Sequence, residues 1–121
     1  MFRADELKER TKRFAIEIVK LYRALPRTDE ARIIGKQLLR SGTSVAANYR
    51  AVIRARSRAE FIAKIGIVVE QADESVFWLE LLIDTNLVER IKVSGLLQEA
   101  NELLAIFAAS HHTAKTREPK Q

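Results

Sequence analysis

Seven basic side chains stand in a stretch of the sequence that contains no acidic residue. The stretch lies between Glu30 and Glu60, and its cations are Arg32, Lys36, Arg40, Arg50, Arg54, Arg56 and Arg58. At about 100° per residue, the first five fall within an arc of roughly 80° on a helix, opposite the apolar positions Leu38 and Val45. Rows of cations of this kind bind phosphate groups, so the row is a candidate nucleic-acid site.

The same row also has a purely structural interpretation. The outer face of a helix is charged by default, and ion pairs with a later helix would then occupy some of the cations. Arg40, at the edge of the arc, is the member that we most expect to pair in this way. The available carboxylates are Glu70, Asp73, Glu74, Glu80 and Asp84.

The residues expected of an enzyme or a metal centre are sparse. The sequence has no cysteine, and its two histidines, His111 and His112, are adjacent, so on a helix they point about 100° apart. Neither a nucleophilic triad nor the paired Glu-x-x-His motifs of a di-iron bundle has its full set of residues. We therefore expect no enzymatic activity, no cofactor, no metal ion and no small-molecule substrate.

A segment of small and hydroxylated residues, 40–49, occupies a place where bulky apolar residues are expected in a helix. Gly35 and Gly42 lie in the same predicted helix, and each costs about 1 kcal/mol relative to alanine. Close approach of another helix would compensate for that cost. Ser41 and Asn48 are expected to form hydrogen bonds in this seam and to fix its register. A ligand pocket lined by serine and asparagine is the alternative.

Four segments show the apolar periodicity of helices. The first runs from Asp5 to Leu25 and ends at Pro26, and the second, capped by Thr28 or Asp29, runs to about Ala55. No segment with the period of a strand competes with these helices.

The third and fourth helices are expected to begin at capping motifs. Ser57 and Glu60 have the spacing of a capping box, so the third helix starts near Arg58. Asn86 with Glu89 is one candidate cap for the fourth helix, and the Ser94-Gly95 pair is a later alternative.

The third predicted helix is apolar on two sides. Beside its main seam runs a second line, Ile62, Val69, Val76 and Ile83, near the aromatic Trp78. One bundle core covers only one side, so the second line predicts an oligomer interface, whereas a helix sunk deeply in its own core is the alternative. The expected packing or interface positions are Ser41, Gly42, Asn48, Val69, Val76, Trp78 and Ile83.

Charge is distributed unevenly along the chain. Of the 121 residues, 1–64 carry 16 basic and 7 acidic groups, whereas 65–121 carry 5 and 9. This polarity predicts contact between the halves, within or between chains, or an anionic partner. The N-terminal residues lack the apolar region of a signal peptide and no apolar run is long enough to cross a membrane, so we expect a soluble cytoplasmic protein without a membrane partner.

The two unusual motifs together resemble those of the 23S ribosomal RNA intervening-sequence proteins, also called four-helix bundle or S23 proteins. The resemblance rests on Gln37–Ser41 with Ser44–Tyr49, and on Glu60–Ile62 with Ala72–Ser75 and Trp78–Leu82. It implies a four-helix subunit that assembles into a ring, with five copies expected, and no known enzymatic activity. The fold is also similar to the accessory variability determinant of diversity-generating retroelements, a basic pentameric barrel. After Asn48 this chain has Ala51 and Val52 where the family often has an acidic residue followed by a small one.

The sequence therefore predicts an all-α protein, an antiparallel up-down-up-down four-helix bundle in residues 1–114 with a frayed polar tail at 115–121. We expect a non-catalytic homo-oligomer, with a pentamer favoured, that binds RNA or a nucleic-acid enzyme through its basic half. The alternative is a purely structural or protein-interaction bundle that binds no nucleic acid.

Overall fold

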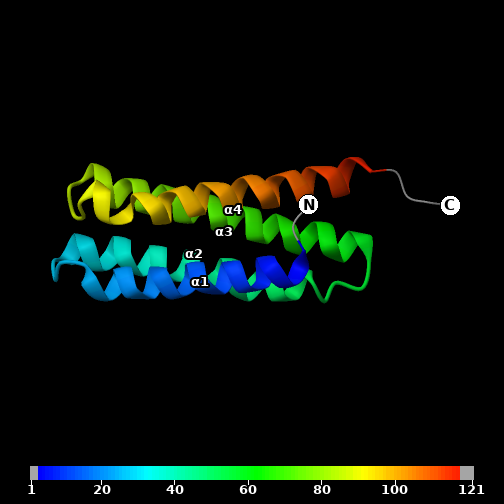
Figure 1. The fold of residues 1–121 in the computed structure, drawn as a ribbon, viewed down its shortest axis with the longest axis horizontal. Coiled ribbons are helices and arrows are strands. Elements are labelled where there is room, and N and C mark those ends of the chain that lie inside the picture. Colours follow the sequence, from blue (N-terminus) through cyan, green and yellow to red (C-terminus); the bar gives the residue numbers. More distant parts are fainter. Residues whose placement is uncertain (1–2, 118–121) are drawn as a thin grey trace.

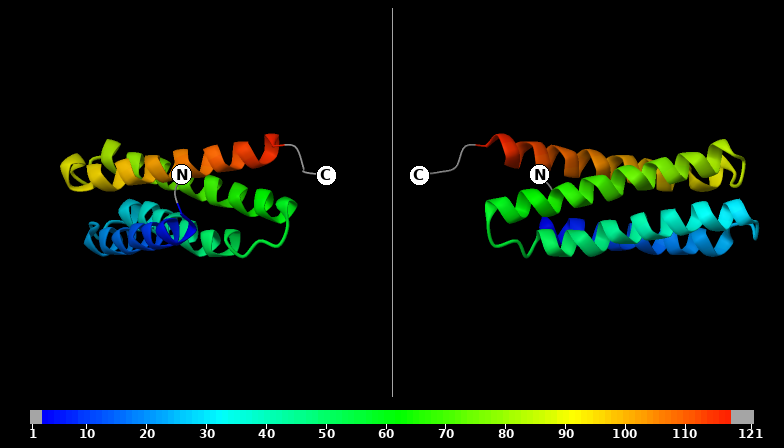
Figure 2. Two further views of the ribbon diagram at one scale, coloured as in Figure 1. Left: turned by 45° about the vertical axis from the view of Figure 1, so that its right-hand side comes forward. Right: turned by 180° about the vertical axis from the view of Figure 1, so that it is seen from behind.

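The computed structural model describes residues 3–117, and it contains four long α-helices and no strand within that range. They are α1 (Ala4–Ala24), α2 (Asp29–Val52), α3 (Arg58–Asp84) and α4 (Arg90–Thr116). Figure 1 shows two layers, α1 with α2 below and α3 with α4 above, and the chain reverses direction at each loop. Seen from behind in Figure 2, α2 and α3 lie side by side, and this pair is in close contact.

The helix ends follow local sequence signals. The α1 helix stops with Leu25 as its cap, directly before Pro26, as the restriction on residues that precede proline requires. The Thr28 side chain accepts a hydrogen bond from the N–H of Ala31 at 3.3 Å, and Ser57 accepts one from the N–H of Glu60 at 3.0 Å. Both are N-cap interactions, which satisfy amide groups that the first helical turn leaves open.

Asn86 is a boundary residue whose role differs from the prediction. It adopts φ 61° in the turn after α3, where its N–H bonds to the carbonyl of Ile83 at 3.0 Å. The N–H of Leu87 bonds to the carbonyl of Leu82 at 3.0 Å, which completes a Schellman motif. Asn86 therefore closes α3 instead of capping α4.

The α4 helix begins between the two predicted starts and ends later than expected. Its N-cap is Glu89, which makes no side-chain capping bond, and its last residue is Thr116. The predicted boundary at residue 114 is therefore two residues early. The part of the predicted tail that comprises residues 118–121 lies outside the described residues.

The core runs along the whole bundle and draws on all four helices. Its fully buried side chains include Ile18 of α1, Leu38 of α2, Leu79 of α3 and Phe107 of α4. Tyr49 packs obliquely on Phe107, with ring centroids 5.2 Å apart and planes inclined by 39°. In α4 Leu103 is buried, whereas its neighbour Leu104 is only half-buried.

The small residues of α2 are packing positions. A Cβ atom added to Gly42 would lie 2.8 Å from Ile18 Cγ1, and one added to Gly35 would lie 2.5 Å from Leu25 Cδ1, so α1 and α2 approach closely. On the other side of α2, the hydroxyl of Ser75 in α3 donates to the buried hydroxyl of Ser41 at 3.1 Å. The predicted close approach is thus confirmed, with α1 as the partner helix at the glycines.

Two residues expected at an oligomer interface are buried inside the subunit instead. Val76 and Ile83 expose 8% and 7% of their surface, because α3 is deeply sunk in the core of its own bundle. Ser41 and Gly42 are likewise buried within the subunit, and Val69 is half-buried. Asn48 is half-buried and donates to the carbonyl of Ser44 at 2.9 Å, so its bond lies within α2 instead of joining two helices.

Candidate nucleic-acid interface

The predicted basic row lies on the outer face of α2, opposite the core. All five members of its arc are exposed, but α2 ends at Val52 and not near the predicted Ala55, so Arg54 lies in the turn after the helix. The four members on α2 are Arg32, Lys36, Arg40 and Arg50. Buried positions such as Leu38, Val45 and Val52 occupy the opposite side of the helix. The part of the row on α2, from Arg32 to Arg50, corresponds to about 27 Å of helix rise.

The cations of the row have few partners inside the subunit. Among residues 3–117, no carboxylate lies within 4.0 Å of the side-chain nitrogens of Lys36, Arg40, Arg50, Arg54 or Arg56. Arg32 alone pairs, with Asp29 of its own helix at 3.6 Å. The row therefore presents largely uncompensated positive charge to solvent.

The alternative in which α3 carboxylates neutralise the row is not realised. Glu70, Asp73, Glu74 and Glu80 are exposed, and within the described range none of them forms an ion pair with α2. Asp84 pairs at 3.9 Å with Arg90 at the start of α4. The expected pairing of Arg40 with a carboxylate of α3 is therefore wrong within residues 3–117.

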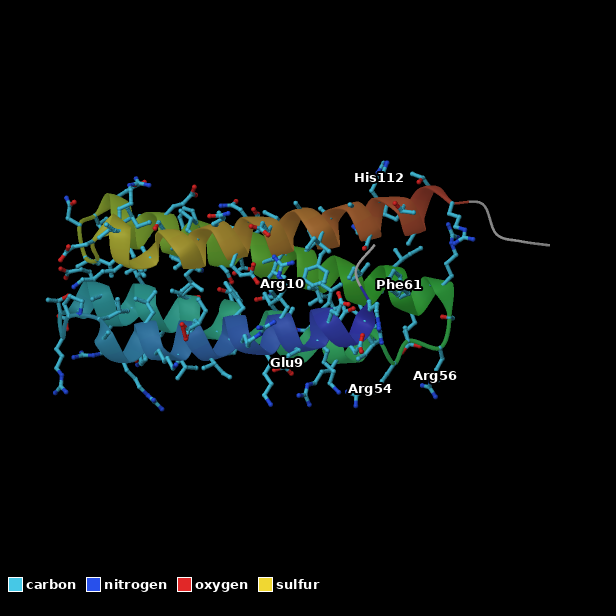
Figure 3. The ribbon with its side chains drawn as sticks, in the orientation of Figure 1. Glu9, Arg10, Arg54, Arg56, Phe61 and His112 are labelled. Atoms are coloured by element: carbon cyan, nitrogen blue, oxygen red, sulfur yellow. The ribbon has the colours of Figure 1, made fainter. Side chains whose placement is uncertain are left out.

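The two residues that extend the row in sequence, Arg56 and Arg58, point in different directions. Figure 3 shows Arg54 and Arg56 projecting from the lower layer, away from α3 and α4. Arg58 instead belongs to the first turn of α3, and its guanidinium donates to the carbonyl of Ala114 at 2.6 Å and to that of Arg117. Arg58 thus satisfies open carbonyls at the C-terminus of α4, and we exclude it from the candidate interface.

A forked ion pair between Arg10 of α1 and two glutamates of α4, here called the fork, joins these two helices. The sequence did not predict it. Arg10 donates through Nε and Nη2 to the Glu99 carboxylate at 2.7 and 2.6 Å, and through Nη2 to Glu102 at 2.8 Å. The hydrogen bond to Glu99 raises the pKa of Arg10 above its ordinary value, although burial opposes it. The only sequence signal was the opposite charge of the two halves, since 89 positions separate the partners.

Grooves flank this fork where α1 and α4 diverge. One, of about 710 Å³, has Phe14, Leu21, Val93 and Leu96 on its apolar side. Charged residues of both signs rim it, including Arg13, Glu17 and Lys92. A mixed rim gives no net preference for anions comparable to that of α2, so the α2 row is the stronger candidate for phosphate binding.

The two histidines do not converge. A Cβ on Gly66 would lie 3.3 Å from His111 Nε2, so His111 packs over α3, whereas Figure 3 shows His112 projecting from the outer side of α4. Within residues 3–117 there is no group of three or more His, Cys, Asp or Glu side chains placed to hold a metal ion. None of the helices in that range has a stretch long and apolar enough to cross a bilayer.

The model of one protein family matches residues 5–109, which is most of the chain. This chain belongs to the 23S rRNA-intervening sequence protein family. A crystal structure from the S23 ribosomal protein family of Bacteroides thetaiotaomicron, of a protein described as having unknown function, is similar to it. The TM-score is 0.84 at 35% identity, and the match covers 93% of this chain and 100% of that one. Comparison with curated proteins gives no match.

Membership of the 23S rRNA-intervening sequence protein family agrees with the two motifs quoted from the sequence. Both motifs build the contact between α2 and α3, in which Ser41 and Ser75 share a buried hydrogen bond. The motifs therefore serve the packing of α2 on α3. The basic row lies on the opposite side of α2 from this contact, and none of its residues is among the buried ones that pack the bundle.

Proposed function

We propose that this chain is a non-catalytic, homo-oligomeric four-helix module of the cytoplasm that binds RNA or another nucleic acid through the outer face of α2. The observation that carries the proposal is the row of exposed cations, Lys36, Arg40, Arg50 and Arg54, without carboxylate partners among residues 3–117. Cations in this state gain most from phosphate, because binding releases the counterions condensed on the nucleic acid. A row of cations with a purely structural role would be expected to form ion pairs with the carboxylates of α3.

Self-association is supported by apolar side chains that the single subunit leaves uncovered on α3. Phe77 is 53% exposed and Ile67 is 42% exposed, although both lie in a helix whose other side is the core. Next to Phe77 is Trp78, at a ring distance of 4.9 Å, and its buried Nε1 has no acceptor among the described residues. A second copy that covers this part of α3 would remove apolar surface from water and could supply an acceptor.

The number of copies comes from the family resemblance, which leads us to propose five. Exposed residues of α3 replace the buried Val76 and Ile83 as the proposed interface. Light scattering across a dilution series tests the assembly, and we expect a mass well above the 13.8 kDa of one chain. Phe77→Asp combined with Ile67→Asp should lower that mass, whereas Ile91→Asp, at an Ile that is 82% exposed on α4, should not. A wild-type monomer would refute self-association.

Nucleic-acid binding is tested by removing the row. The variant K36Q/R40Q/R50Q/R54Q should bind RNA more weakly than wild type, with a flatter dependence on salt, at unchanged oligomer size. Each phosphate that no longer meets a cation should lower the log-log salt slope by about 0.7 on a single strand. The matched control R13Q/R90Q/K92Q/K115Q removes four exposed cations elsewhere and should retain wild-type affinity.

The outcomes separate the two candidate functions. If wild type binds no RNA at about 50 mM salt, where such contacts are strongest, the nucleic-acid proposal fails. If it still forms an oligomer, the alternative of a protein-interaction bundle is the function that stands. Equal loss of affinity in the row variant and the control would show that net charge alone matters, which would refute a site on α2.

A further inference from the structure

We infer that α1 adds a second row of cations, Lys8, Lys12 and Arg23, beside the row of α2, and that the two rows together bind a nucleic-acid duplex along its phosphate backbones. This inference rests on the proposed nucleic-acid binding. It assigns three further binding residues and names the class of nucleic acid. Neither the family motifs nor the sequence pattern of α2 points to α1.

The contacts of α1 fix which way its charged residues face. Ile18 lies against Gly42 of α2, and Arg10, about 80° away around the helix, bonds to Glu99 of α4. Lys8, Lys12 and Arg23 are about 80° to 140° from Ile18 in the opposite sense. They therefore lie on the outward side of α1, on the edge that adjoins α2.

The row on α1 is as poorly compensated as the row on α2. Lys8, Lys12 and Arg23 are exposed, and no carboxylate in residues 3–117 lies within 4.0 Å of their side-chain nitrogens. The acidic residues nearest this face are few. Asp5 pairs with Arg3 at 3.1 Å, Asp29 pairs with Arg32 at 3.6 Å, and Glu9 lies at the edge away from α2.

The pairing of α1 with α2 sorts these cations into two clusters. Gly35 meets Tyr22 and Gly42 meets Ile18, so later residues of α2 face earlier residues of α1. Arg50 and Arg54 thus fall near Lys8 and Lys12 at one end of the face. At the other end, Arg32, Lys36 and Arg40 fall near Lys20 and Arg23.

A neutral region separates the two clusters. Along the outward side of α1 it extends from Lys12 to Lys20, which corresponds to about 12 Å of helix rise. A shallow hollow of about 330 Å³ lies there, with Ala15, Ile16 and Val19 between the cations Lys12, Lys20 and Arg23 at its rim. The opposite segment of α2, between Arg40 and Arg50, also lacks charge.

This spacing suits a duplex better than a single strand. A duplex presents two phosphate backbones with a groove between them, and the major groove of B-form DNA is about 12 Å wide. Two cationic clusters with a neutral gap of about 12 Å can contact one backbone each while the groove spans the gap. The successive phosphates of a single strand would instead cross the neutral region without partners.

The face also lacks the rings that single strands use. Among residues 3–117 the exposed aromatic side chain is Phe77, which belongs to α3. Tyr22 of α1 is half-buried and packs on Gly35. Proteins that bind single strands stack bases on aromatic side chains, whereas duplexes are held through backbone and shape. The chemistry of the α1–α2 face is therefore that of backbone recognition.

The test compares duplexes with a single strand. Fluorescence anisotropy would measure binding of an RNA duplex, a DNA duplex and oligo(U), each of about 20 nucleotides per strand, to the full-length protein. The variant K8Q/K12Q/R23Q removes the α1 row, and R13Q/R90Q/K92Q removes three exposed cations outside the face. Glutamine preserves helix propensity, and light scattering checks that the assembly is intact.

We expect wild type to bind a duplex at least about tenfold more tightly than oligo(U), because one strand cannot engage both clusters at once. K8Q/K12Q/R23Q should lose about tenfold or more in duplex affinity, with the log-log salt slope reduced by about 0.9 for each phosphate that no longer meets a cation, and the control should not. The two duplex probes show whether A-form or B-form geometry is preferred.

Three results would overturn the inference. If wild type binds oligo(U) as tightly as the duplexes and K8Q/K12Q/R23Q keeps wild-type affinity, the duplex preference and the α1 row are both refuted. The proposed function is left intact. No binding of any probe by wild type removes the proposed function as well. Binding of wild type to vesicles containing phosphatidylserine but to no duplex would assign the face, with Ile16 44% exposed, to an anionic membrane.

Discussion

The two edges of α1 are joined to the bundle in different ways. On one edge Ile18 lies against the backbone of Gly42, with no room for a further carbon atom. On the other edge the helix diverges from α4, leaves a groove of about 710 Å³ and is held by the fork from Arg10 to Glu99 and Glu102. The first contact is apolar and depends on shape, whereas the second is charged and partly exposed. The comparison indicates that the α1–α2 contact, which depends on shape, tolerates fewer substitutions than the α1–α4 edge, which depends on charge.

The largest expected effect is at the glycine contact. Gly42→Leu should lower the free energy of unfolding by roughly 1 to 3 kcal/mol or more, because the new side chain has to displace the fully buried Ile18. Gly95→Leu is the matched control in α4, where a Cβ meets nothing within 4 Å. It should instead stabilise the protein by up to about 1 kcal/mol through helix propensity. Urea unfolding measures both, and a neutral Gly42→Leu would refute the close approach.

A smaller effect is expected at the charged edge. Arg10→Met should lower the free energy of unfolding by about 1 to 2 kcal/mol, because it leaves Glu99 and Glu102 facing each other without their cation. A double-mutant cycle with Glu99→Gln measures the coupling of the pair. No coupling between the two substitutions would mean that the fork does not join the helices in solution.

The pKa of Arg10 gives the fork a defined pH dependence. Bonding to Glu99 raises that pKa above its ordinary, already strongly alkaline value, so the stabilising charge is fully present at neutral and mildly alkaline pH and is lost only in strong alkali. The difference in stability between wild type and Arg10→Met should therefore be the same at neutral pH and at mildly alkaline pH. Loss of the difference in mild alkali would contradict the assignment.

The smallest effect concerns Tyr49, which joins α2 to α4 across the core and bypasses α1. Burial raises the pKa of Tyr49 above its ordinary value of 10.0. The folded state then keeps its proton while the unfolded state ionises, so stability should fall as the pH rises above 10.0. Tyr49→Phe should be nearly neutral at pH 7 and should reduce this alkaline loss, as thermal unfolding would show. If stability fell with pH as steeply in Tyr49→Phe as in wild type, burial of the Tyr49 hydroxyl would be refuted.

The sequence predicted the helices well because their signals are local. Pro26, the cap at Thr28 and the capping box at Ser57 each act within a few residues, and all three mark the observed boundaries. Asn86 was misassigned because an asparagine before a helix suits either an N-cap or a left-handed turn that ends the preceding helix. The contacts of α3 decide between these, and they are not visible in the local sequence.

The candidate site was predictable only in part. The azimuths of Lys36, Arg50 and Arg54 follow from helix geometry, so their common face could be foreseen. The diversion of Arg58 to the end of α4 and the adjacency of the α1 row depend on which helices meet. Val76 and Ile83 were expected at an oligomer interface, with burial in the bundle's own core as the alternative, because apolar periodicity does not tell whether a neighbouring helix or a second copy covers a face.

The most direct test of nucleic-acid binding is whether the protein carries nucleic acid when it is purified from its own host. Wild type isolated at low salt should retain RNA that is released as the salt concentration rises, as counterion release requires. K36Q/R40Q/R50Q/R54Q, isolated in the same way and of the same oligomer size, should retain little. Wild type free of nucleic acid at low salt, or a variant that retains as much RNA as wild type, would contradict the account.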